Sequence, residues 1–249
     1  MTATLIRVEI AKLRRLRLTW LLLLTTAANV LYCSSPLFSA SARRYWNQPG
    51  GAWDAYLVQY VMGTALFTPI AIAIVASRVV DIEHAGNGWR LSSVIGVTRG
   101  ALCRLKWVTL APIVLALRAI EVAAVLALPA LLGMPAVTNL GVWVRTAAVM
   151  VVTTLALLAA HLWLAARIES QLVGIGIAVL GGFLAMFSML LPPVVALLTP
   201  YGSFAAVLPY TYSSSGIIAI SPHYLPWGLW AAALLVGSWA LTRRLDQEG

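Results

Sequence analysis

Two residues of opposite charge lie three positions apart inside a long apolar run of the sequence. Arg118 and Glu121 fall near the middle of residues 107–132, and residues at positions i and i+3 share one face of a helix. A charge at the centre of a bilayer is costly, so such residues usually pair and mark a functional site. We expect this pair either to face a translocation path or subunit interface, or to hold helices together.

His161 is the one histidine within a predicted span, residues 146–166. It could relay a proton or contact a ligand, but a hydrogen-bonded packing residue is the simpler interpretation. An intramembrane hydrolase would need an activated serine beside a histidine base, and Ser188 has no such sequence context. The sequence also lacks the P-loop and zinc-protease motifs and any metal-ligand spacing. We therefore predict that the chain is not an enzyme and holds no cofactor or metal.

The longest polar stretch, residues 78–106, is a third candidate site. It contains the turn Gly86-Asn87-Gly88, whose residue types tolerate positive φ, and then a short helix-like run, residues 89–95. A solvated connecting loop does not need an exposed Trp, Val and Ile, whereas a partner-binding surface does. We expect an apolar patch centred on Trp89 to bind another protein, with a plain connection as the alternative.

Six apolar runs must position these residues. The chain has 249 residues, of which 61% are hydrophobic and 10% charged, which excludes a soluble globular enzyme and a disordered protein. About 20 apolar residues span a bilayer. The chain is therefore predicted to be an all-α polytopic membrane protein. Its six spans are predicted at residues 18–38, 55–77, 107–132, 146–166, 172–198 and 225–242.

The net charge of +9 comes from short basic clusters between apolar runs, which argues against a nucleic-acid partner. The clusters at the N-terminus, in residues 78–106 and in the tail place both termini in the cytoplasm of a bacterial inner membrane. Residues 5–17 carry Ile6, Ile10, Leu13 and Leu16 at helical spacing. This pattern predicts an interfacial amphipathic helix drawn to anionic lipid, although the charges could simply set topology. The basic residues of this helix are Arg7, Lys12, Arg14, Arg15 and Arg17.

Residues 199–224, between the fifth and sixth spans, carry no charge. They include two apolar pieces, Phe204–Leu208 and Ile217–Ile220. Uncharged, irregular backbone at membrane depth must be covered by protein or line a cavity. We expect a re-entrant pair of short helices that dips into the membrane from outside, with a surface loop as the alternative. Pro192-Pro193 is expected to kink or break the fifth span.

The polar stretch resembles the signature loop of the ABC-2 type permeases. The acidic residue that opens the loop, the Asn/Gly turn, the aromatic–basic pair and the later basic residues are matched in order. The matching positions here are Glu83, Asn87-Gly88, Trp89-Arg90, Arg99 and Lys106, with Gly96 near where many members carry Pro. The layout looks closest to the permeases of lantibiotic immunity and peptide-antibiotic resistance.

The resemblance implies that residues 1–249 form one transmembrane domain of an exporter. A second permease copy or a related permease would complete it, and separate cytosolic ATPases would bind ATP and magnesium. The inner loop would be the coupling helix that inserts into the ATPase. The residues assigned to this coupling are Glu83, Gly88, Trp89, Arg90, Val94, Arg99 and Lys106. The implied substrate is amphiphilic: an antimicrobial peptide, a lipid-like molecule or a hydrophobic drug. The alternative is a membrane accessory or assembly protein without a transport path.

Overall fold

A computed structural model describes residues 2–39, 51–213 and 216–247. Within them, six helices are long and apolar enough to cross a membrane, which confirms the all-α polytopic prediction. These helices are α2 (Leu18–Ser34, extended by the 3-10 turn η1, Ser35–Phe38), α4 (Gly51–Ala85), α6 (Arg99–Leu131), α7 (Leu140–Arg167), α8 (Gln171–Ser188) and α11 (Tyr224–Leu245).

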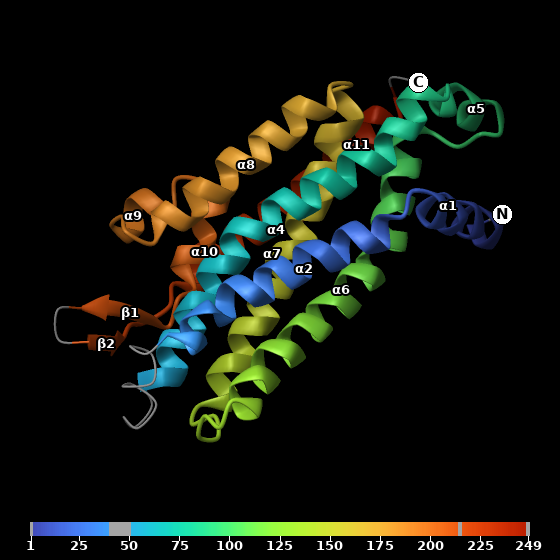
Figure 1. The fold of residues 1–249 in the computed structure, drawn as a ribbon. Coiled ribbons are helices and arrows are strands. Elements are labelled where there is room, and N and C mark those ends of the chain that lie inside the picture. The colour runs from blue at the N-terminus through green and yellow to red at the C-terminus, as the bar shows by residue number, and fades with distance from the viewer. Residues whose placement is uncertain (1, 40–50, 214–215, 248–249) are drawn as a thin grey trace.

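The spanning helices form one elongated bundle (Figure 1), with α4 and α7 the most buried of the six. Helix α4 packs against α8, α7 and α2, and α7 also packs against α6 and α11. The N-terminal helix α1 (Thr2–Arg15), the short helix α5 (Gly88–Val94) and the last turn of α11 lie at one end (Figure 1). We call this end the basic end, and the opposite one the hairpin end.

Helices α4 and α6 are longer than the sequence predicted. The second span was expected over residues 55–77 and the third over 107–132, but the helices cover Gly51–Ala85 and Arg99–Leu131. The stretch between residues 78 and 106 is therefore mostly helix, not loop. Helix α4 continues because nothing interrupts it before Gly86 and Asn87, where Asn87 takes a left-handed conformation at φ 52°. Helix α6 starts early because the Thr98 side chain caps it, accepting from the Ala101 amide.

The segment after α8 corrects two expectations. The fifth span ends at Ser188 rather than 198, close to the predicted break at Pro192-Pro193. Three short helical turns follow, α9 (Pro193–Ala196), η2 (Pro200–Gly202) and α10 (Ser203–Ala206), and then the antiparallel hairpin β1 (Tyr210–Ser213) and β2 (Gly216–Ala219). The second predicted short helix, at Ile217–Ile220, is thus wrong. Its β-branched Ile217 and Ile218 favour a strand, and they pair with Tyr212 and Thr211.

The turns before the hairpin double back along the bundle. The Tyr201 ring lies so close to Gly181 that no Cβ would fit there, and Gly181 is eleventh of the 18 residues of α8. The Trp230 indole of α11 donates to the Leu197 carbonyl at 2.9 Å. Buried Phe204 anchors α10 against the bundle. This packing is what a re-entrant element requires, and its depth in the bilayer stays a prediction.

Candidate functional site

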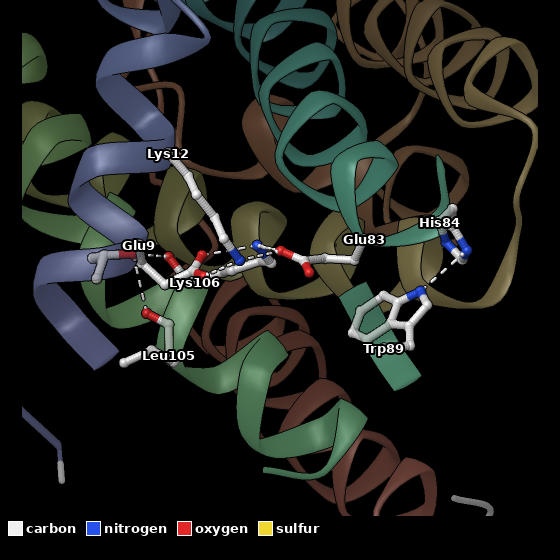
Figure 2. A network of polar contacts seen from close by, with 8 residues as sticks. Glu9, Lys12, Glu83, His84, Trp89, Leu105 and Lys106 are labelled. Carbon is white, nitrogen blue, oxygen red and sulfur yellow. Dashed lines mark hydrogen bonds and ion pairs between the residues drawn. The ribbon is translucent and has the colours of Figure 1, made fainter. Parts of the chain in front are cut away.

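Four charged side chains form a closed ring at the basic end, where α1, α4 and α6 meet (Figure 2). Lys12 donates to Glu9 and to Glu83, each at 2.7 Å. Lys106 donates to the same two carboxylates, each at 2.8 Å. Every cation therefore touches both anions, and the ring has no net charge. It fastens the N-terminal helix to two spanning helices at the basic end of the bundle.

Three of the four ring residues lie inside the protein, whereas the Lys12 side chain is 30% exposed. Glu9, Glu83 and Lys106 are 1–2% exposed, so Glu83 and Lys106 are not part of an open surface for a partner. Burial alone would lower the pKa of the Lys12 ammonium, but the hydrogen bonds to Glu83 and Glu9 outweigh it and raise that pKa above 10.5. A buried ion pair needs such complete pairing, because removing one partner leaves an uncompensated charge.

Helix α1 packs differently from the predicted apolar stripe. Leu13 is buried as expected, but Ile10 is 40% exposed and Glu9 takes a buried place instead. Sequence reasoning missed Glu9, although its spacing of three residues from Lys12 is an ion-pair signal. The remaining basic residues of the helix and its end point outward, namely Arg7, Arg14, Arg15 and Arg17. The left-handed conformation of Arg17 (φ 52°) separates α1 from α2.

Gly88 connects the ring to α5. A Cβ at Gly88 would collide with the carboxylate of Glu83, so the glycine allows α5 to begin directly against the ring. The preceding turn closes through the Gly86 amide, which donates to the Ile82 carbonyl at 2.9 Å. Because Gly88 contacts Glu83 directly, a displacement of α5 would also move the Glu83 side chain.

Trp89 is buried, which corrects its prediction as the exposed centre of an apolar patch. It is 7% exposed, and its indole donates to Nδ1 of His84 at 3.2 Å (Figure 2). His84 Nε2 lies 3.1 Å from the Ala165 carbonyl of α7. Because an indole N–H can only donate, Nδ1 must accept and Nε2 must carry the proton. This relay joins α5 to α4 and α7. The Arg99 guanidinium lies 5.8 Å from the Trp89 ring centre.

The exposed apolar face of α5 is made by other residues. Leu91, Val94 and Ile95 are 66%, 85% and 60% exposed, and at helical spacing they share one side of the helix. Arg90 is exposed nearby. The prediction of an apolar surface on this segment is confirmed. Trp89 lies on the buried side of α5, where it holds the helix to His84.

The second candidate site is the predicted charge pair within α6. Arg118 Nη1 donates to Glu121 Oε1 at 2.6 Å, and Nη2 donates to the Thr68 hydroxyl of α4 at 2.7 Å. Glu121 is 1% exposed. The pairing is confirmed and it also joins α6 to α4. Whether transport uses the pair stays a prediction.

Polar side chains from α2 and α4 surround this pair. The Asn29 amide donates to the Thr64 hydroxyl at 3.3 Å, and the Cys33 thiol lies 3.4 Å from the Asn29 carbonyl oxygen. Gly63 has no room for a Cβ beside Asn29 and Cys33, which lets α2 and α4 approach closely. The polar cluster therefore lies where three spanning helices meet.

A comparison with known families identifies the family of this chain. The sequence model of the ABC-2 family transporter proteins matches residues 5–201. The chain belongs to the ABC-2 transporter family. No curated protein matches the sequence closely. The matched residues include α1 from residue 5 onward, α5, the charged ring and the Arg118–Glu121 pair. Members of this family are membrane-spanning transport subunits, and the family generally implies an ABC ATPase partner.

His161 of this ABC-2 chain lies apart from the charge pair. Its Nε2 is 3.3 Å from the Tyr201 hydroxyl of η2, so it joins α7 to the doubled-back segment. Ser188 donates to the Ala185 carbonyl at 2.6 Å instead of to a histidine, so the hydrolase alternative gains no support. Within residues 2–39, 51–213 and 216–247, no cluster of His, Cys, Asp or Glu could hold a metal ion.

The C-terminal end of the ABC-2 chain carries a contact that the sequence did not predict. Asp246 accepts from the Thr98 hydroxyl, from the Ala101 amide at 3.0 Å and from Arg104 at 2.9 Å. Burial would raise the pKa of this carboxyl, but the bonds from Thr98 and Arg104 outweigh it and lower the pKa below 3.8. A carboxylate at a helix N-terminus is favourable, so the end of α11 caps the start of α6.

Proposed function

We propose that this chain is the permease subunit of an ATP-driven exporter whose cytosolic ATPase binds the exposed face of α5. The observation that carries the proposal is the solvent-exposed triplet Leu91, Val94 and Ile95 on a short helix between two spanning helices. An apolar patch on a polar end of a membrane protein favours a protein partner. The sequence has no P-loop of its own, so the ATP and magnesium would be bound by that partner.

The attachment of α5 supports a role in transmitting force. Through Trp89 and His84 it is joined to the carbonyl of Ala165 in α7. Through Gly88 it abuts Glu83 and hence the ring that holds α1 and α6. Of the residues first assigned to coupling, Val94 would touch the ATPase, while Glu83, Gly88, Trp89 and Lys106 would transmit its motion. An ATP-dependent preference for one arrangement would then shift the bundle between two states.

The membrane orientation follows from the charges in this proposal. The basic end would face the bacterial cytoplasm, with both termini inside. The outward side chains Arg7, Arg14, Arg15 and Arg17 on and after α1 would meet anionic lipid. A second copy of this chain or a related permease would complete the translocation path. The doubled-back segment and the hairpin would then form the outer gate.

The proposed cargo is an amphiphile, such as an antimicrobial peptide, a lipid-like molecule or a hydrophobic drug. Its support is the polar Arg118–Glu121 cluster within an otherwise apolar bundle. Placement in the lantibiotic-immunity branch is part of this proposal and rests on the length and the six-span layout of the chain.

Capture of the ATPase tests the proposal. The tagged chain is purified in mild detergent from its native host, and a soluble Walker-A protein is expected to accompany it. Val94→Asp places a charge on the apolar face of α5 and should release that protein. Ser93→Asp adds the same charge to another exposed side of α5 and should retain it. Purification of the wild-type chain without any ATPase would favour the accessory-protein alternative.

A further inference from the structure

The polar cluster around Arg118 borders a small cavity between α2, α4, α6 and α7. Side chains from α2, α4, α6 and α7 line it, among them Thr26, Asn29, Ala71, Arg118, Glu121 and Thr154. Its volume, counted as space open to the centres of water molecules, is about 20 Å³. A space of this size admits one or two small polar atoms.

Arg118 and Glu121 can form more hydrogen bonds than they make with the part of the chain that the structure describes. A guanidinium has five N–H donors, and Arg118 uses one for Glu121 and one for Thr68. Glu121 accepts from Arg118 through Oε1, which is the one hydrogen bond found for its carboxylate among the residues that the structure describes. Donors and an acceptor thus remain side by side where the bilayer offers no water.

The charges of the cavity decide what it can hold. Arg118 and Glu121 cancel each other at 2.6 Å, so a further buried charge of either sign would lack a counter-ion and would be expelled. An uncharged group that both donates and accepts suits the remaining capacity: an amide or a hydroxyl. Apolar neighbours such as Phe67, Ile72 and Val114 suit the hydrocarbon attached to such a group.

We propose that the cavity between α2, α4, α6 and α7 binds the uncharged amide or hydroxyl group of an amphiphile, with Arg118 donating and Glu121 accepting. This inference rests on the proposed export function and narrows its substrate class. Molecules whose polar part is entirely cationic or anionic would not occupy this site. Peptide backbone amides and sugar hydroxyls have the required chemistry.

Three probes with the same 12-carbon chain test the selectivity. Dodecanamide, dodecylammonium and dodecyl phosphate are added to the chain in nanodiscs of phosphatidylcholine, without any ATPase. The wild-type chain should be stabilised against thermal unfolding most strongly by the amide. Glu121→Gln leaves Arg118 uncompensated and should raise the affinity for dodecyl phosphate about tenfold. Arg118→Gln should do the same for dodecylammonium. Between variants each probe is compared with itself, so its partitioning into the bilayer cancels. On the wild-type chain the three probes are compared at equal concentration in the bilayer.

A pair of charge-conserving variants covers the case in which the single-charge variants fail to fold. Ala71→Leu fills the cavity and should abolish the amide-induced shift, whereas Ala119→Leu on the exposed side of α6 should preserve it. An equal response of Ala71→Leu and wild type to dodecanamide overturns the proposal, as does an unchanged probe preference in two folded charge variants. Because no ATPase takes part, these results are independent of whether the exporter proposal holds.

Discussion

At the scale of single residues, the Arg118–Glu121 pair is the clearest case in which charge type and spacing foretold a contact. Two opposite charges at i and i+3 inside an apolar run have few ways to avoid each other, and they meet at 2.6 Å. The third member, Thr68, comes from another helix. No local sequence pattern predicts the contact with Thr68, because the rotation of α4 relative to α6 depends on the whole interface between the two helices.

The pair makes a prediction about stability. Glu121→Ala should lower the melting temperature more than Arg118→Ala and Glu121→Ala together, because a lone buried charge costs more than none. Breaking a buried pair costs about 3–5 kcal/mol. Thermal unfolding of the purified variants in one detergent measures this. A double variant that melts below both single variants would contradict it.

Gly88 makes a second prediction at this scale. Gly88→Ala pushes a methyl group into the Glu83 carboxylate and should destabilise the fold by about 1–3 kcal/mol, the usual cost of overpacking. Gly228→Ala in α11 is the matched control, because nothing lies near a Cβ there. Denaturation of both variants is compared with wild type, and an equal loss in the two would disprove the close contact.

At the scale of elements, periodicity predicted which segments are helical better than where they end. The apolar runs gave six spans, but α4 and α6 continue past their apolar parts into segments where Glu83 and Lys106 are buried by contacts with α1. Glu83 and Lys106 are the instructive residues. In the sequence they are loop charges, and only the arrival of α1 with Glu9 and Lys12 makes their helical, buried positions possible.

The ring therefore predicts that α1 is held by charge. Glu9→Gln removes one anion from a ring that holds two cations, and should loosen α1 from α4 and α6. Arg15→Gln, an exposed position on the same helix, removes one charge without touching the ring. Hydrogen exchange of the α1 amides should rise in Glu9→Gln and stay unchanged in Arg15→Gln. The same protection in both variants would show that the ring does not anchor α1.

The contact between α11 and α6 carries a pH dependence. The pKa of Asp246 is lowered in the folded chain, so its contribution is present above the ordinary value of 3.8 and is lost as pH falls through the folded value. Asp246→Asn lacks this contribution at every pH. The stability difference between wild type and variant should thus shrink as the pH falls below about 4. Melting temperatures across an acid series measure it, and a constant difference would refute the assignment.

At the scale of the whole molecule, the sequence predicted the class of architecture but not its long-range closures. The uncharged stretch after α8 was rightly separated from the spans. The Tyr201 contacts with Gly181 of α8 and His161 of α7 depend on how the chain doubles back over both helices, which periodicity does not encode. The candidate surface on α5 was foreseen as apolar. Val94 and Ile95 are exposed as expected. Trp89 alone lies inward, because His84 accepts from its indole and is itself bonded to the Ala165 carbonyl.

The proposed orientation can be tested because the basic end and the hairpin end lie at opposite ends of the bundle (Figure 1). We expect the basic end in the cytoplasm and the hairpin end outside. Ser93→Cys marks the first end and Ile218→Cys, 44% exposed in the native chain, marks the second. A membrane-impermeant maleimide should label Ile218→Cys in intact cells, and Ser93→Cys only after permeabilisation. The wild-type chain is the control, because Cys33 and Cys103 are both buried. Labelling of Ser93→Cys from outside would invert the topology and remove α5 from the reach of any cytosolic ATPase.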